Sequence, residues 1–275
     1  MTITLAQVRR ESGATTDLYS DDDINALISS YPIRVYEYFD IKIVPTDTIE
    51  FVRNYDINSI KVNQQKIMTL KSVNINGSER DINTITFNEH LGKIQPRREY
   101  DRTWISLFAK NEPYRIKVKY SYAMLKTSGT ATETASTATA GDSVVISVDS
   151  SSDFTVNDYV RIKGFDGSNE VCKITAKDTG EITVDKLYYS HEVNSVVEKL
   201  KVPEVIENYM LYDICYSVAS NIIGNTSNLP TSWSQEGESA TIGVAYTHWR
   251  EAAEKFREQR DKYESSVWAL KSTLL

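Results

Sequence analysis

The amino-acid sequence predicts an α+β protein: a helical core with a small antiparallel β region, plus an inserted small all-β barrel or sandwich domain. The spacing of apolar residues is helical near both ends of the 275-residue chain and alternates with a period of two in the middle. A stretch of Thr, Ser, Ala and Gly at 126–140 then precedes short, evenly spaced strand-like segments. We therefore expect a core formed by residues 1–125 and 198–275, a linker at 126–140, and a β domain at 141–197 that projects from the core on this tether.

Two helices are expected before residue 40. Thr4 and Gln7 are spaced as a capping box, and Gly13 is a suitable stop for the first helix. Ser20 precedes three aspartates, which indicates a second helix start, because a hydroxyl caps the first turn and the helix dipole favours acids there. We expect Pro32 to kink or end this helix near Tyr31, since proline lacks a donor and clashes with the preceding turn. A further turn or two through Val35 and Phe39 stays open.

Strands are expected in two groups. The first group alternates apolar and polar residues and lies at 49–52, 57–62, 67–73, 82–87 and 114–122. Asn76 and Gly77 are expected to form a tight turn within it. The second group belongs to the predicted inserted domain and lies at 144–148, 159–162, 171–175, 182–184 and 193–197.

Two helices are expected near the C-terminus. The segment 203–223 carries two neighbouring apolar stripes, so it must be covered on more than one side. Either a neighbouring subunit or the chain itself can supply the second cover. The last helix is expected to open at Thr247, and its apolar residues recur at alternating steps of three and four with Arg260 as the one break. This spacing indicates a helix that packs lengthwise.

Composition excludes several classes of protein. The net charge is −7, whereas a protein that grips nucleic acid through its phosphates needs a basic face. Passage of DNA past an acidic surface stays open. No apolar run approaches the ~20 residues of a membrane span, and the N-terminus does not resemble a secretory signal. Cys172 and Cys215 are expected to be reduced thiols, because they fall in different predicted domains.

The sequence shows no arrangement of residues that would support catalysis. His90, His191 and His248 lie far apart and lack the spacing of metal ligands, and the cysteines form no CxxC pair. Nucleophile-elbow and phosphate-loop motifs are absent as well. The aspartates at 21–23 are explained by the helix start. We therefore expect no catalytic, metal-binding or cofactor-binding residues, no cofactor, and a protein that is not an enzyme.

Three stretches follow one another in an informative order. The first is 20–28 (SDDDINALI), the second is the strand 116–122 (IKVKYSY), followed beyond the insert by 202–206 (VPEVI), and the third is 242–246 (IGVAY), which leads into the last helix. In this order they resemble the head–tail connector, or adaptor, family of tailed bacteriophages. The connection between 122 and 202 is usually brief in that family. Here it holds the predicted β domain, which is similar to small β modules of phage virion proteins.

The resemblance implies a structural virion protein of the neck, made in the host cytoplasm. Family members form a dodecameric ring below the portal, extend the DNA channel and provide the docking surface for the tail. The implied partners are the portal protein, identical subunits and the next tail or neck protein. DNA would be passing cargo only, and no membrane would be involved.

Apolar residues of the two C-terminal helices are the candidates for subunit and portal contacts. They are Tyr209, Tyr212, Tyr216, Trp249, Phe256, Tyr263, Val267, Trp268, Leu270 and Leu274. The portal candidates are the three near the end of the chain: Trp268, Leu270 and Leu274. Three alternatives stay open: a tail-completion or neck protein at another position, a surface- or carbohydrate-binding module, and a tail enzyme. The second would need exposed aromatic residues on the β domain, and the third a nucleophile–base or acid pair.

Overall fold

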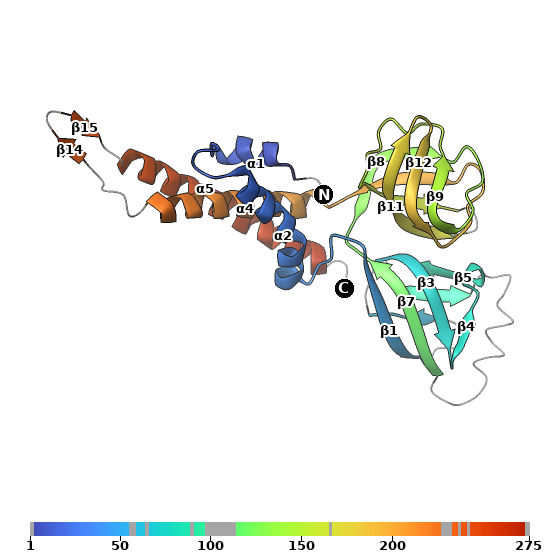
Figure 1. Ribbon diagram of the computed structural model, residues 1–275. Helices are drawn as coiled ribbons and strands as arrows, with labels where there is room; N and C mark the ends of the chain where they lie inside the picture. The colour runs from blue at the N-terminus through green and yellow to red at the C-terminus, as the bar shows by residue number, and fades with distance from the viewer. Residues whose placement is uncertain are drawn as a thin grey trace. The chain divides into compact units, whose positions relative to one another are not determined.

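A computed structural model shows the arrangement of the chain (Figure 1). It describes residues 3–54, 59–63, 66–88, 91–96, 114–164, 167–226, 233–235, 238–240 and 243–272. The chain forms two compact units. Residues 1–41 and 202–273 form a helical unit, and residues 42–201 form a β unit.

The fold is mostly β, so the predicted helical core with a small β region is wrong. Within the described residues, thirteen strands form three antiparallel sheets and two more form a hairpin, β14 (Trp233–Gln235) with β15 (Glu238–Ala240), whereas the α-helices number four. The strands between 46 and 122 were expected to pack on the helices. They bury a core of their own instead, and the β unit therefore needs no helical layer to cover it.

The first part of the β unit consists of two facing sheets. One has the order β1 (Thr46–Asn54), β7 (Tyr114–Tyr122), β3 (Ile67–Ile75), β4 (Ser78–Arg80), and the other has the order β2 (Ile60–Lys61), β6 (Lys93–Pro96), β5 (Ile85–Asn88). Their shared core contains Ile60, Val62, Ile67, Leu70, Val73, Ile75, Ile85, Ile94, Ile116, Val118 and Tyr120.

Two local predictions for this part have clear outcomes. The turn at Asn76 and Gly77 is confirmed: both residues have positive φ, 52° and 86°, and they join β3 to β4. The strand expected at 82–87 begins later. Ile82–Thr84 forms a 3-10 turn, η1, because the side chain of Asp81 accepts a hydrogen bond from the Asn83 backbone and caps it.

The second part of the β unit is a single curved sheet of six strands. Its order is β8 (Lys126–Glu133), β13 (Val196–Lys201), β10 (Tyr159–Lys163), β11 (Asn169–Asp178), β12 (Glu181–Leu187), β9 (Gly141–Ser147). A bridge between Thr134 and Val148 brings the end of β8 beside the end of β9. The two outer strands therefore meet, and the sheet closes toward the barrel seen in Figure 1.

The prediction of a linker at 126–140 is wrong for about half of this segment, because its first residues form strand β8. Ser128, Thr130 and Thr132 alternate as half-buried residues with exposed neighbours, which is the period of a strand. Thr is β-branched and suits a pleated surface, so a Thr-rich segment that looks like a linker can complete a sheet.

The barrel is not an appendage on a tether, because hydrogen bonds join it to the first part of the β unit. The Thr69 hydroxyl of β3 accepts a hydrogen bond from the Val171 backbone N–H at 2.8 Å and donates one to its carbonyl at 3.1 Å. The Tyr189 hydroxyl donates to the carbonyl of Leu70 at 3.0 Å. Tyr189 is 2% exposed, so this bond is shielded from water.

Charged side chains of the barrel form two clusters, one partly exposed on its outer face and one buried inside. Glu198 of β13 accepts hydrogen bonds from Arg161 at 2.7 Å and from Lys163 at 2.6 Å, both on β10. Burial by itself would raise the pKa of Glu198, but these two cations outweigh burial and hold the pKa below its usual value. Glu170 and His191 are fully buried, and their side chains lie 2.8 Å apart.

The helical unit contains α1 (Leu5–Ser12), α2 (Asp21–Phe39), α4 (Glu204–Thr226) and α5 (Gly243–Ser272). The capping box of Thr4 and Gln7, the left-handed Gly13 and the Ser20 cap are all confirmed. α2 continues through Pro32, because Val35 and Phe39 beyond it are buried and anchor the extra turns.

The start of α5 and the state of the two cysteines were also predicted. α5 begins at Gly243, one turn before the expected start at 247. Cys172 and Cys215 are buried thiols in different units and form no disulfide, as expected, and burial raises the pKa of Cys215 to about 12.

Candidate interaction site on the helical unit

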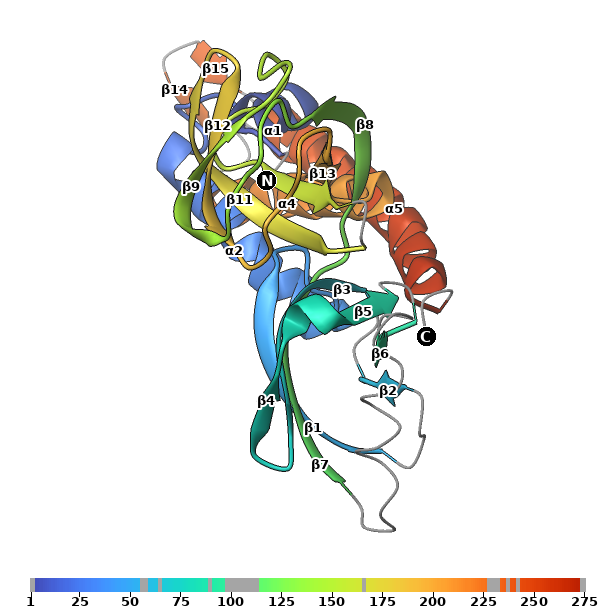
Figure 2. The same cartoon turned by 90° about the vertical axis from the view of Figure 1, so that its right-hand side faces the viewer.

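α4 is covered mainly by helices of its own chain. α5 lies along it, as Figures 1 and 2 both show, and α1 and α2 also pack against it. One predicted stripe is completely buried by this packing: Ile206, Met210, Ile214, Val218 and Ile222. The sequence left open whether a neighbouring subunit or the chain itself covers the second side of this helix. Over the stripe named above, the chain's own helices provide the cover.

The ten candidate contact residues fall into four groups. Those buried inside the helical unit are Tyr209, Trp249, Phe256 and Val267. Those half-buried are Tyr212, Tyr216, Tyr263 and Leu270. Trp268 is 42% exposed, and Leu274 lies outside the described residues. The buried group contributes to the packing of the unit, so only the second and third groups present surface to a partner.

Trp268 belongs to a partly exposed cluster of aromatic rings, which we call the aromatic patch: Tyr38, Phe39, Tyr209 and Trp268. Phe39 lies at its centre, with ring centroids 5.1 Å from Trp268 and 4.9 Å from Tyr209, both edge-to-face. Tyr38 is 53% exposed, and its hydroxyl donates to Glu264 of α5 at 2.6 Å. The patch thus joins the ends of α2 and α5 and leaves two large rings on the surface.

Further aromatic contacts hold α4 against α5. Tyr212 stacks on Tyr263 with centroids 5.7 Å apart and planes within 8° of parallel. One turn along α4, the guanidinium of Arg260 lies 5.0 Å from the ring centroid of Tyr216. Arg260, the one break in the apolar pattern of α5, is thus part of the interface between the two helices.

A polar cluster around Asp213 connects α2, α4 and α5. The Asp213 carboxylate on α4 accepts a hydrogen bond from the Tyr31 hydroxyl and forms ion pairs with Arg34 at 3.1 Å and Arg260 at 3.3 Å. Tyr31 and Arg34 lie on α2, and Arg260 lies on α5. The Asp213 side chain is 10% exposed, so its charge is shielded from water and compensated by two cations.

The surroundings of this carboxylate keep the neighbouring phenols protonated. Burial first, and then the negative charge of Asp213, raise the pKa of Tyr31 far above its usual value. The same two causes raise the pKa of Tyr209. A phenol in this state donates a hydrogen bond and does not act as a base, so the cluster fixes three helices relative to one another and offers no nucleophile.

Sequence reasoning missed Tyr31 as a polar partner, and it missed Asp213 and Arg34 entirely. Two signals pointed to the cluster. Asp213 is an acid inside the apolar segment 203–223, and Arg260 interrupts the apolar stripe of the last helix. Buried charges in facing helices usually compensate one another, so these two irregularities together predict an ion pair.

The histidines do not form a metal site in the described part of the chain. His191 pairs with Glu170 inside the barrel, His248 lies beside Trp249 on α5, and His90 lies outside the described residues. Across the ranges that the structure describes, no group of three or more His, Cys, Asp or Glu side chains is placed to hold a metal ion.

Comparison with known proteins does not assign the chain to a family. No family model matches it, and a search of curated proteins finds no significant match. Among the described helices, none is both long and apolar enough to cross a membrane.

Proposed function

We propose that the chain is a structural head-to-tail adaptor of a tailed bacteriophage, which forms a ring below the portal and provides a docking surface for the tail. The observation that carries this proposal is that the helical unit exposes apolar side chains on two separate faces. A closed ring needs two such faces, because each subunit contacts its two neighbours through different surfaces.

The first face is the aromatic patch, with Tyr38 and Trp268 exposed at the ends of α2 and α5. The second is the outward side of α2, where Ile33 is 62% exposed and Tyr36 is 37% exposed. Successive residues rotate by about 100° around a helix, so Tyr36 and Tyr38 lie on nearly opposite sides of α2. Trp and Tyr are the residues that most often dominate the energy of protein contacts. We assign the aromatic patch to the portal and the outward side of α2 to the neighbouring subunit.

The charge of the protein is consistent with a channel through which DNA passes. At a net charge of −7, the chain repels phosphate and does not hold DNA in place. The partners that follow from the proposal are the portal protein, identical subunits and the next tail or neck protein, and the location is the neck of the virion.

The test mixes the purified full-length chain with the portal protein of the same phage and examines the mixture by sedimentation and negative-stain microscopy. We expect a closed collar on the narrow end of the portal. Ile33→Glu should prevent ring closure, and Trp268→Ala should weaken docking by at least about thirtyfold, the effect of losing a hot-spot ring. Phe51→Glu is the matched control, because Phe51 is 75% exposed but lies on the β unit.

The outcomes separate the candidate positions in the particle. A wild-type chain that ignores the portal but binds tail components would overturn the adaptor assignment and favour a tail-completion protein. Equal losses for Trp268→Ala and Phe51→Glu would overturn the assignment of the aromatic patch. Circular dichroism spectra identical to that of the wild type are required of each variant, so that unfolding is not mistaken for lost docking.

A further inference from the structure

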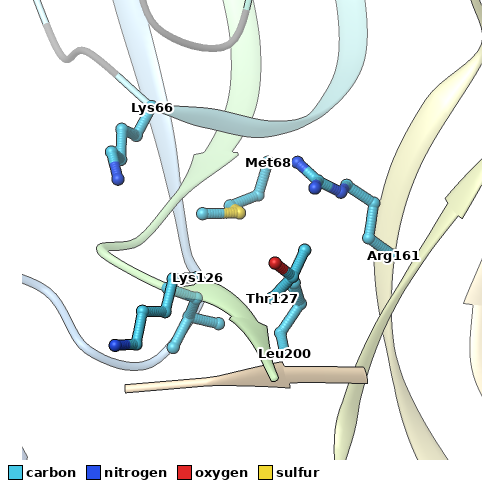
Figure 3. A pocket seen from close by; sticks show the side chains of 7 residues that line it. Lys66, Met68, Lys126, Thr127, Arg161 and Leu200 are labelled. Atoms are coloured by element: carbon cyan, nitrogen blue, oxygen red, sulfur yellow. The ribbon is translucent and has the colours of Figure 1, made fainter. Parts of the chain in front are cut away.

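The β unit contains a cavity of about 220 Å³ between its two parts. It is lined by Lys66, Met68, Leu125, Lys126, Thr127, Arg161 and Leu200. Figure 3 shows Lys66 and Lys126 on one side of this space, Arg161 on the other, and Met68 between them. None of the lining residues within the described part of the chain is acidic.

The lining combines an apolar floor with a basic rim. Met68, Leu125 and Leu200 form the floor, and each is at most 7% exposed. The charge of Arg161 is already compensated by Glu198, which binds it at 2.7 Å. Lys126 supplies further positive charge at the rim, and no ion pair of its side chain is found among the described residues.

The strand register places a second lysine beside Lys126. Lys126 of β8 lies directly opposite Lys201 of β13 in the antiparallel pair. Like charges in this position repel, and among the described residues neither Lys126 nor Lys201 forms an ion pair with an acid. A bound anion at this end of the strands would relieve the repulsion.

We propose that this cavity binds a carboxylate carried on a short aliphatic chain. The carboxylate lies at the lysine rim, and the aliphatic chain covers Met68, Leu125 and Leu200. Such a ligand satisfies both halves of the lining, whereas a bare inorganic anion leaves the apolar floor in contact with water. The site is separate from the two faces assigned to the ring and the portal, so it goes beyond the adaptor role and does not depend on it.

Two sources can supply this chemistry: a free small carboxylate, or a protein segment with an aliphatic residue beside acids. The chain itself contains such a segment. Leu18 is 43% exposed and is flanked by Asp17 and the three aspartates at 21–23. A second copy of the chain could therefore present it, and the experiment below distinguishes the two sources.

The test is a titration of the full-length chain with hexanoate, followed by NMR of ¹³C-labelled methionine methyl groups at low salt. Met68 lines the cavity and is the reporter, and its resonance is assigned with Met68→Leu. Met210 is buried in α4 and is the reference. We expect a saturable shift of Met68 alone, and no shift with hexanamide, which has the same shape and no charge.

Lysine variants test the rim. Lys126→Gln should raise the dissociation constant of hexanoate about threefold, the effect of one partly exposed ion pair, and Lys126→Glu should abolish binding. Lys177→Gln is the matched control, because Lys177 is an exposed lysine of the same barrel that lines a different cavity. Unchanged affinity in Lys126→Gln and Lys126→Glu would overturn the proposal, as would an equal response to hexanamide.

A peptide of residues 14–24 (ATTDLYSDDDI) then identifies the source. Displacement of hexanoate by this peptide, lost when the leucine is replaced by alanine, supports a protein segment as the natural ligand. Binding of hexanoate without displacement by the peptide supports a free small carboxylate. Failure of both ligands to shift Met68 overturns the site but leaves the adaptor proposal intact, because portal docking is measured independently.

Discussion

Replacing Asp213 by alanine should destabilise the helical unit more than any substitution of an exposed acid. The carboxylate binds the Tyr31 hydroxyl and the guanidinium groups of Arg34 and Arg260, so its removal affects three helices at once. The size of the loss in stability depends on which of these partners can form hydrogen bonds with water once the carboxylate is removed.

Burial of the three partners sets the magnitude. Tyr31 is 1% exposed, so its hydroxyl would lose its acceptor without gaining water, at a cost of about 1–3 kcal/mol. Arg34 and Arg260 are 42% and 23% exposed at their side chains and can rehydrate, so each adds only about 0.5–1 kcal/mol. The expected loss in the free energy of unfolding is therefore about 2–5 kcal/mol.

Urea denaturation followed by far-UV circular dichroism measures this loss, because the helices dominate that signal. Asp261→Ala is the matched control: Asp261 also binds Arg260, at 2.7 Å, but is 53% exposed, so its removal should cost less than about 1 kcal/mol. A double-mutant cycle of Asp213→Ala with Tyr31→Phe should give a coupling energy of at least about 1 kcal/mol. The reasoning fails if Asp213→Ala costs no more than Asp261→Ala, or if the cycle is additive.

Two further predictions concern the β unit. Because two cations hold the pKa of Glu198 below its value in the unfolded chain, their stabilisation is fully present above about pH 4.3 and is lost as pH falls through the lower, folded-state pKa. Thermal unfolding between pH 3 and pH 6 should therefore show a steeper loss of stability on acidification for the wild type than for Glu198→Gln, and equal slopes would contradict this. Tyr189→Phe removes the hydrogen bond to the Leu70 carbonyl and should cost about 1 kcal/mol in urea denaturation, with faster hydrogen exchange where the two β parts meet. An unchanged exchange rate there would show that this bond does not couple them.

Local signals predicted local structure well. The capping box of Thr4 and Gln7, the cap at Ser20 and the turn at Asn76 and Gly77 all form as expected. Each depends on hydrogen bonds and dihedral angles within a few residues, which the sequence specifies directly.

Packing partners were harder to predict. The period of two identified most strands of the β unit, but it did not reveal that they pack on one another and not on the helices. The stretch at 126–140 was misread because its composition resembles a linker, whereas its alternation of Thr with exposed residues supports strand β8. Composition describes what a segment contains, and the neighbouring strand decides whether it pairs.

For the candidate contact residues, too, the sequence indicated which residues are apolar but not which of them are buried. The sequence identified ten apolar residues of the C-terminal helices, yet four of them, Trp249 and Val267 among them, are buried in the helical unit. Of the candidates that the structure describes, Trp268 alone is exposed, at 42%. The exposed side of α2, with Ile33, was not predicted, because an amphipathic pattern does not state which of its apolar residues stay outside.

The sequence by itself determined the helices, the caps, the turn, most of the strands and the acidic charge, since each depends on the periodicity, identity or number of residues along the chain. The tertiary structure alone decided the two-unit division, the closure of the barrel through β8, and the joining of Asp213 to Arg260 across 47 positions. These features depend on contacts between residues far apart in the chain. Many pairings satisfy the same local pattern, and only burial and charge compensation in the folded protein select one of them.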